Sequence, residues 1–382
     1  MTFTAGQDNV PFMDLVAHHA PLKQQMLAAF GEVLDRAMFV GGSALERFET
    51  EFARAAGSRY AVGVSSGTDA LRFALLALRI GPGMRVITVP NTFIATTEAI
   101  SQAGAQFDFI DVDPATCLMD PNRLEDHLRR VFASSDKHQR PAAIVPVHLY
   151  GQCAEMEAIM SLANKYQLKV LEDAAQAHGA THKAKAAGTF GDAAAFSFYP
   201  AKNLGACGEG GAVTTDDPAL ADRVRMYRDH GQNSKYFHAV EGYNGRLDAL
   251  QAALLSVKLP HLAGWNAARR EIAGLYDQQF SGIDWIRPVE LKPHNVSAHH
   301  LYVIHAAQRD RLQQHLAQRR VGTGLHYPLP LHLQECYAHL GLAAGSYPNA
   351  ERSARELLSL PMFAELGKER AAYVVDAVKA FQ

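Results

Sequence analysis

The chain has 382 residues and a near-neutral charge, with 37 Lys plus Arg against 39 Asp plus Glu. This balance gives no basic excess for nucleic acid or an anionic membrane surface, and no stretch reaches the roughly 20 apolar residues that span a bilayer. The length and the hydrophobic content of 48% predict a large core and two domains.

The start of the chain lacks a basic segment followed by an apolar core, so we expect no signal peptide. The chain has 18 histidines but no His-Glu-x-x-His motif, and we expect no metal site. The four cysteines lie far apart, which favours a reduced compartment without disulfides or structural zinc. These features predict a cytoplasmic, enzyme-sized protein. The cysteines are Cys117, Cys153, Cys207 and Cys336.

Residues 1–24 are expected to form an irregular N-terminal arm that ends at a helix. Residues 25–246 alternate short apolar runs with helical patterns. The expected strands are 60–64, 85–89, 106–110, 143–147, 168–172, 193–198 and 212–214, and the expected helices are 69–79, 94–103, 121–132 and 155–166. Strands separated by such helices predict an α/β fold with a mostly parallel sheet covered on both faces. Ligands of such sheets bind beyond the carboxyl ends of the strands.

Residues 247–382 are expected to form a connecting helix, interrupted at Pro260, and a small α+β domain. The helical pattern of the connector runs to about residue 280. In the small domain the patterns predict strands at 301–304 and 324–327 and helices at 310–320, 350–359 and 367–380.

A single lysine follows the apolar run 195–199 and precedes a glycine-rich turn, which leaves room beside the amine of Lys202. Asp173 follows the apolar run 168–171, at the carboxyl end of an expected strand. A lysine that forms a Schiff base and an acid that keeps a pyridinium nitrogen protonated are the groups that pyridoxal phosphate chemistry requires. The pair predicts this cofactor. The alternatives are a surface lysine and an aspartate that caps the next helix.

A second motif, Ser66-Gly67-Thr68, follows a strand and opens a helix. The free N–H groups of a first helical turn, the close approach allowed by Gly67 and the hydroxyl of Thr68 make it a candidate phosphate site. An ordinary N-cap explains the same residues and is the commoner case. Ser197 is expected to add a hydroxyl, and Gln176 to reach the phenolic oxygen of the cofactor.

In their order along the chain, these motifs resemble the nucleotide-sugar aminotransferases of the DegT/DnrJ/EryC1/StrS family, which are fold-type I pyridoxal phosphate enzymes. The likeness runs from about residue 10 to the carboxyl end. The segments that carry it are 66–68, 90–93, 148–151, 172–176, 197–211, 229–231, 242–248 and 326–328.

The resemblance implies that Lys202 carries the cofactor, that Asp173 binds its pyridinium nitrogen and that Phe93 stacks on its ring. Asn244 would reach the phosphate from a neighbouring subunit, so the implied assembly is a homodimer with shared active sites. The residues implied for cofactor binding are Ser66, Gly67, Thr68, Phe93, Asp173, Gln176, Ser197, Lys202 and Asn244. Those implied for substrate binding are Tyr199, Arg246, His326 and Tyr327.

The resemblance also implies L-glutamate as amino donor, pyridoxamine phosphate as an intermediate form and a nucleotide-linked ketosugar as acceptor. The turn 198–205 is similar to that of the 3-ketosugar branch, which implies transfer to C3 of a 3-keto-6-deoxyhexose linked to thymidine diphosphate (dTDP). A C4 ketosugar, a UDP-sugar and a cyclitol remain alternative acceptors. A non-catalytic, pyridoxal-phosphate-binding regulatory protein is the alternative outside enzymes.

Overall fold

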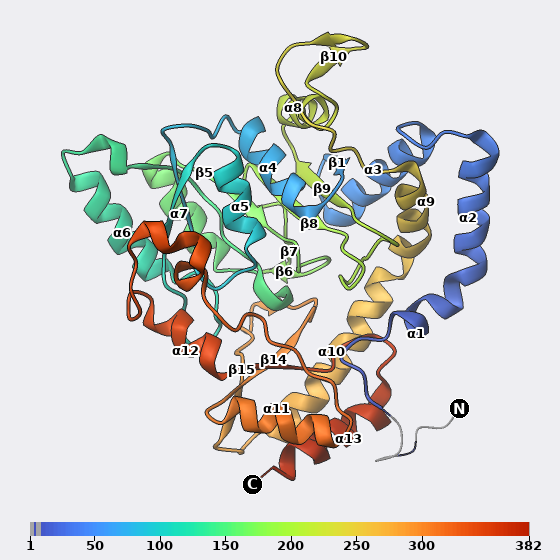
Figure 1. The fold of residues 1–382 in the computed structure, drawn as a ribbon, viewed down its shortest axis with the longest axis vertical. Coiled ribbons are helices and arrows are strands. Elements are labelled where there is room, and N and C mark those ends of the chain that lie inside the picture. Colours follow the sequence, from blue (N-terminus) through green and yellow to red (C-terminus); the bar gives the residue numbers. More distant parts are fainter. Residues whose placement is uncertain (1–3, 5–8, 382) are drawn as a thin grey trace.

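A computed structural model describes residue 4 and residues 9–381 of the chain. A large domain surrounds a central sheet, and a smaller domain lies below it in Figure 1, where α10 runs between the two. In the described residues, no helix has the length and apolar character needed to cross a membrane. The expected boundaries at residues 24 and 246 stay a prediction.

The central sheet has seven strands in the order β1-β9-β8-β5-β4-β2-β3. The neighbouring pairs from β8 to β3 are parallel, whereas β9 is antiparallel to both β8 and β1. The mostly parallel α/β sheet predicted from the sequence is thus confirmed. Its strands are β1 (Tyr60–Val64), β2 (Arg85–Thr88), β3 (Gln106–Phe109), β4 (Pro141–Ile144), β5 (Lys169–Asp173), β8 (Ala193–Ser197) and β9 (Gly211–Thr215).

Helices cover both faces of this sheet because its strands are apolar on both sides. One face packs against α4 (Gly67–Ala77), α5 (Ala95–Gln102) and α8 (Pro218–Arg228). The other face packs against α3 (Ser43–Ala56), α6 (Pro121–Ala133), α7 (Met156–Tyr166) and α9 (Ala249–Lys258). The sequence analysis missed α3 and α8.

The N-terminal arm is helical from Leu15 onward, which corrects the expected irregular arm. It contains α1 (Leu15–His19), the 3₁₀ turn η1 (Ala20–Leu22) and α2 (Lys23–Arg36), which packs along α9. The connector is helical as predicted, and its break at Pro260 is a 3₁₀ turn because proline has no N–H to donate. The connector consists of α9, η4 (Leu259–His261) and α10 (Leu262–Phe280).

The small domain has a three-stranded antiparallel sheet in the order β12-β14-β15, packed against α10, α11 and α13. Its elements are β12 (Ile286–Pro288), β14 (Tyr302–Ala306), α11 (Arg309–Gln318), α12 (Pro348–Glu356), β15 (Leu357–Leu360) and α13 (Gly367–Lys379). The helix expected to reach residue 359 ends at Glu356. The buried run 357–360 suits a helix or a strand equally, and pairing with β14 decides for the strand.

The strand expected at 324–327 is wrong, because only Gly324 pairs, in an isolated bridge with Ser359. Pro328 cannot extend a ladder, since it lacks an N–H. Short elements without a periodic pattern were also missed. They are β6 (Thr181–His182), β7 (Lys185–Ala186), β10 (Gln232–Ser234), β11 (Phe237–His238), β13 (Asn295–Val296), η2 (Lys137–Gln139), η3 (Leu149–Gly151), η5 (Leu331–Leu333) and η6 (Glu335–Leu340). In Figure 1 the β10–β11 hairpin extends from the top of the molecule beside α8.

The strand β5 carries a fully buried carboxylate, Glu172, on the face opposite Asp173. Its Oε1 accepts hydrogen bonds from the N–H groups of Phe190 and Gly191 at 2.7 and 2.8 Å. Its Oε2 accepts from the N–H of Gly188 at 2.8 Å and from Nε2 of His148 at 2.9 Å. This carboxylate holds the loop before β8 against β5, and so helps to place the strand that leads to Lys202.

We expect Glu172→Ala to lower the free energy of unfolding by about 3 kcal/mol or more, because it leaves buried donors without an acceptor. Glu172→Gln keeps an oxygen for some of these donors and should be less damaging. Urea unfolding followed by intrinsic fluorescence measures both. The control is Glu157→Ala, which removes an exposed carboxylate that pairs with Lys183. Equal midpoints for Glu172→Ala and this control would contradict the structural role.

Candidate active site

Lys202 lies beyond the carboxyl end of β8, in a tight turn at the start of the connection 198–210 that leads to β9. The N–H of Lys202 donates to the carbonyl of Tyr199 at 2.8 Å. A Cβ on Gly205 would lie 2.2 Å from the carbonyl oxygen of Pro200, so the turn tolerates only glycine there. Asn203 anchors the turn, since its Nδ2 donates to the carbonyl of Ala298 at 2.7 Å. The turn therefore fixes the base of the lysine side chain.

Burial lowers the pKa of Lys202 to about 8, although the negative charge of Asp173 offsets part of the shift. A larger share of its amine is therefore neutral near physiological pH than in an exposed lysine. The neutral amine is the form that acts as a nucleophile or accepts a proton. This position is unlike that of a surface lysine, which was the alternative considered from the sequence.

Asp173 is the last residue of β5, and the sheet register pairs it with Ala195 of β8. Its Oδ2 accepts a hydrogen bond from Oγ1 of Thr96 at 2.8 Å, and its Oδ1 accepts from the N–H of Ala175 at 3.2 Å. Burial raises its pKa, while these hydrogen bonds and the charge of Lys202 counteract the shift. The chain after Asp173 forms turns rather than a helix, so Asp173 caps no helix.

Thr96 and Thr92 were missed in the sequence analysis. Their hydroxyl oxygens lie 2.9 Å apart, and Thr96 continues the chain of hydrogen bonds to Asp173. The sequence signal was present, because both threonines follow β2 on the same sheet edge as Asp173. A hydroxyl has no unique partner in a sequence, so only the fold identifies them as the residues that orient this carboxylate.

Gln176, Tyr327 and Phe93 form a wall beside Asp173. Nε2 of Gln176 donates to the hydroxyl of Tyr327 at 3.3 Å, and its Oε1 accepts from the N–H of Tyr150 at 2.7 Å. The rings of Phe93 and Tyr327 lie 5.7 Å apart between centroids. Burial and the charge of Asp173 raise the pKa of the Tyr327 hydroxyl. Because Tyr327 comes from the carboxyl-terminal part of the chain, the site is built from both domains.

A backbone cradle lies where β1 meets α4. A Cβ on Gly67 would lie 2.6 Å from Cβ of Ser197, and a Cβ on Gly211 would lie 2.3 Å from the carbonyl oxygen of Ser66. The backbone at the start of α4 thus approaches Ser197 closely with no side chain of residue 67 between them, and the N–H groups of a first helical turn favour an anion such as a phosphate. Thr68 lies half-buried in the first turn. Ser66 also caps the helix, since its Oγ accepts from the N–H of Asp69 at 3.1 Å.

The structure does not bring all of the predicted site residues into direct contact with Lys202, Asp173 or the cradle at Gly67. Arg246 pairs with Asp229 and donates to Oδ1 of Asn244 at 2.7 Å, at the base of the β10–β11 hairpin. Tyr199 is 51% exposed beside the lysine turn. The Nδ1 atom of His326 lies 2.9 Å from Oγ of Ser359. Burial and the charge of Lys202 lower the pKa of His326 to about 4, so its imidazole is neutral at pH 7.

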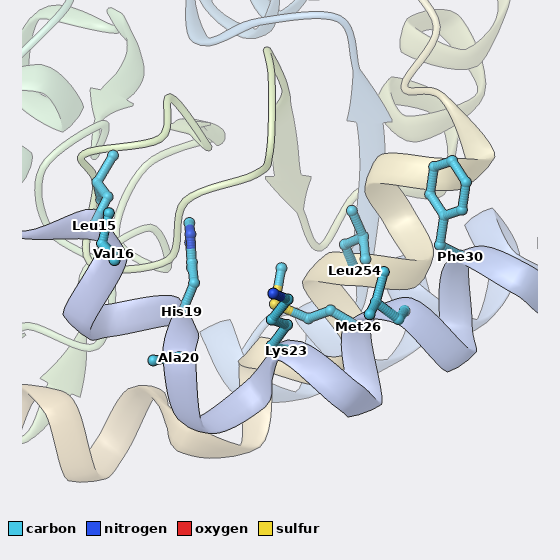
Figure 2. A pocket seen from close by; sticks show the side chains of 9 residues that line it. Leu15, Val16, His19, Ala20, Lys23, Met26, Phe30 and Leu254 are labelled. Atoms are coloured by element: carbon cyan, nitrogen blue, oxygen red, sulfur yellow. The ribbon is translucent and has the colours of Figure 1, made fainter.

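A separate apolar hollow of about 590 Å³ lies along the N-terminal helices (Figure 2). Residues of α1, η1 and α2 line it together with Leu254 of α9. Neither Lys202 nor Asp173 borders it, and it contains no acid. It is therefore distinct from the candidate active site.

Comparison with known proteins places these features in a family. The model of the DegT/DnrJ/EryC1/StrS aminotransferase family matches residues 21–379. The dTDP-3-amino-3,4,6-trideoxy-alpha-D-glucose transaminase of Streptomyces venezuelae is 42% identical over 99% of this chain and 98% of its own. The UDP-N-acetyl-3-dehydro-alpha-D-glucosamine 3-aminotransferase of Acidithiobacillus ferrooxidans is 41% identical over 97% of both chains. A Geobacillus stearothermophilus relative named pleiotropic regulatory protein is 42% identical over 98% of both chains.

Among solved structures, that of S. venezuelae DesV in complex with a ketimine intermediate matches with a TM-score of 0.93 and 42% identity. The match covers 98% of this chain and 98% of that one. The predicted fold class is thereby confirmed.

The described site fits pyridoxal phosphate, the cofactor of this family. The cradle at Gly67 and Ser197 suits an anionic phosphate, and the buried carboxylate of Asp173 suits a cationic ring nitrogen. Phe93 is 54% exposed, so a face of its ring is available for an aromatic cofactor ring to stack on. Lys202 would supply the amine that holds the cofactor covalently, as the sequence predicts. The assignments of individual residues to these roles stay predictions.

We expect cofactor uptake by the apoenzyme to speed up with rising pH and to be half-maximal at about pH 8, because the neutral Lys202 amine is the reactive form and its pKa lies there. The rate is measured from the change in cofactor absorbance after mixing. Since the charge of Asp173 raises the pKa of Lys202, the control Asp173→Asn should move the midpoint to lower pH. A midpoint near the ordinary lysine value of 10.5 would contradict the assignment.

Proposed function

The chain belongs to the DegT/DnrJ/EryC1/StrS aminotransferase family, and from that premise we propose that it transfers an amino group from L-glutamate to C3 of a dTDP-linked 3-keto-6-deoxyhexose. The enzyme is a pyridoxal-phosphate-dependent aminotransferase. The observation that carries the proposal is the pairing of the half-buried Lys202, which lies beyond the end of β8, with the buried Asp173 at the end of β5. The named relatives of the chain include sugar 3-aminotransferases.

The bound cofactor supplies an electron sink for the carbanion formed at the substrate carbon. Asp173 holds the ring nitrogen protonated, and Thr96 fixes the orientation of this carboxylate. Nζ of Lys202, with its lowered pKa, would take the proton from the substrate carbon and return it at C4′ of the cofactor, and the deaminated donor would leave as a 2-oxo acid. In the second half of the reaction the ketosugar receives the amine, and Lys202 would move a proton in the opposite direction, from the cofactor to the sugar carbon.

The remaining residues position the reactants. Gly67, Thr68 and Ser197 hold the phosphate, and Phe93 and Gln176 restrain the ring. The sugar would rest on the turn that carries Tyr199, because that turn leads directly into Lys202. We assign Arg246, His326 and Tyr327 to the nucleotide sugar as well. The neutral imidazole of His326 favours hydrogen bonding to a sugar hydroxyl over charge pairing with the diphosphate.

We propose a homodimer in which each site takes Asn244 from the partner chain. Two exposed apolar surfaces support this assembly. One lies along the hollow on α2, where Leu27 and Phe30 are 54% and 39% exposed. The other lies on the hairpin beside Asn244, where Tyr236 and Phe237 are 78% and 71% exposed. Apolar patches of this kind mark contact surfaces between proteins.

The alternatives considered from the sequence differ in their support. The A. ferrooxidans relative is named for a UDP-sugar, so UDP remains a rival nucleotide. The G. stearothermophilus relative is named as a regulatory protein, but this chain has both Lys202 and Asp173, close enough to shift each other's pKa. A C4 ketosugar or a cyclitol would use the same catalytic pair. No comparison names a compartment, and the cytoplasmic location stays a prediction.

We expect the pyridoxamine form of the enzyme to aminate dTDP-linked 3-keto-6-deoxyhexose at C3, because the turn before Lys202 is similar to that of the 3-ketosugar branch and would form the floor under the sugar ring. The measurement incubates this form with 3-keto and 4-keto sugars, each linked to dTDP and to UDP, and locates the new amine by NMR. Lys202→Ala is the control and should give no product. Turnover of the 4-keto sugars alone would overturn the C3 assignment and leave the aminotransferase activity standing.

Mixing two inactive variants tests the shared site. We expect Lys202→Ala and Asn244→Ala each to be inactive as homodimers. After subunit exchange, activity should return to at most about a quarter of the wild-type rate, because half the dimers are hybrids with one intact site of two. Rates are measured before and after exchange, with Lys202→Ala mixed with itself as control. A fully active Asn244→Ala variant, or an active monomer, would contradict the shared site.

A further inference from the structure

Three potential metal ligands from separate segments meet away from the lysine turn. Glu155 precedes α7, His182 lies on β6, and His294 precedes β13. One ligand atom from each lies within 4.8 Å of the other two. Oε1 of Glu155 is 3.0 Å from Nε2 of His294, and the rings of the two histidines meet edge to face with centroids 4.7 Å apart.

His182 supplies the decisive detail. Its side chain is buried, and its Nε2 has no hydrogen-bond partner in the described part of the chain. Its Nδ1 lies 2.8 Å from Oδ1 of Asn295, and an amide oxygen only accepts, so Nδ1 carries the proton. The lone pair of Nε2 is thus free. A histidine held in this way by a second residue is typical of metal ligands.

The orientation of Asn295 is itself fixed. Its Nδ2 donates to Oε1 of Gln152 at 3.1 Å and to the carbonyl of Cys153 at 2.9 Å. These two acceptors determine which end of the amide is nitrogen, so its oxygen must face His182. The tautomer of His182 therefore follows from the hydrogen bonds of the surrounding backbone and side chains.

We propose that Glu155, His182 and His294 bind one divalent transition-metal ion, for which zinc and cobalt are the probes. Two imidazoles and a carboxylate are a preferred donor set for such ions. Ligand atoms around one tetrahedral ion lie about 3.4 Å apart. The ligand atoms of this cluster lie within 4.8 Å of one another, so they must move closer to bind one ion. Rotation of the two half-buried side chains, Glu155 and His294, can close the gap while the buried His182 stays fixed. Water fills the fourth position.

An ordinary ion pair between Glu155 and His294 does not account for this cluster, because it leaves Nε2 of His182 buried without a partner. The nearby lysines do not neutralise the site either. Lys183 pairs with Glu157, and Lys292 pairs with Glu290 at 2.9 Å. The sequence analysis expected no metal because the three ligands are spread over 139 positions and form no local motif.

The test uses metal-free holoenzyme in a Cys207→Ser, Cys336→Ser background, since both thiols are exposed and would bind added metal. Cobalt is titrated and followed by its visible d–d absorption, and zinc is added as competitor. We expect one tight equivalent that zinc displaces. Glu155→Gln and His294→Gln should each weaken it by about 100-fold, whereas His182→Ala is avoided as the main variant because that residue is buried.

The matched control is Glu125→Gln, which changes a partly exposed carboxylate of α6 that pairs with Arg129 and Lys165 and lies outside the cluster. It should bind cobalt like the parent enzyme. Circular dichroism verifies that all variants are folded. No tight equivalent in the parent, or the same affinity in Glu155→Gln, His294→Gln and Glu125→Gln, would overturn the proposal. The readout is independent of the proposed aminotransferase substrate.

Discussion

The structure depends on holding two opposite charges, those of the half-buried Lys202 and the buried Asp173, near the carboxyl ends of the neighbouring strands β8 and β5. Burial opposes the charged form of each, and each charge favours the charged form of the other. As a result the pKa of the Lys202 amine is about 8. The pKa of Asp173 is raised by burial and lowered by its hydrogen bonds, including the one from Thr96. An exposed lysine, with a pKa of 10.5, has far less neutral amine at neutral pH than Lys202 has, and without its hydrogen bonds and the charge of Lys202 the pKa of Asp173 would be raised further.

Most of the surrounding architecture maintains that balance. On one face of β5, Thr96 orients Asp173, and on the other face Glu172 ties the loop before β8 to the sheet. On the next strand, the turn after Ser197 fixes the backbone at Lys202 through glycine packing and a side-chain anchor. The relative position of two adjacent strands thus sets the distance between the reactive groups.

The mostly parallel α/β sheet and the candidate residues Lys202 and Asp173 could be predicted from the sequence, because apolar runs and glycines are strong local signals. It could not identify Thr96 as the partner of Asp173, since that contact joins residues 77 positions apart and any nearby hydroxyl would fit the pattern equally. The same limit explains the errors in the small domain. The run 357–360 is apolar throughout, so only its pairing with β14 determines its conformation.

The segment from His294 to His300 links the proposed metal cluster to the active site. Asn203, next to Lys202, donates to the carbonyl of Ala298, and its Oδ1 lies 3.1 Å from Nδ1 of His300. The other end of the segment pairs β13 with β6 and contributes His294 to the cluster. An ion bound there would connect the start of α7 to this segment without touching the reactants. Because the segment supports the lysine turn, restricting its motion also restricts the position of the reactive amine.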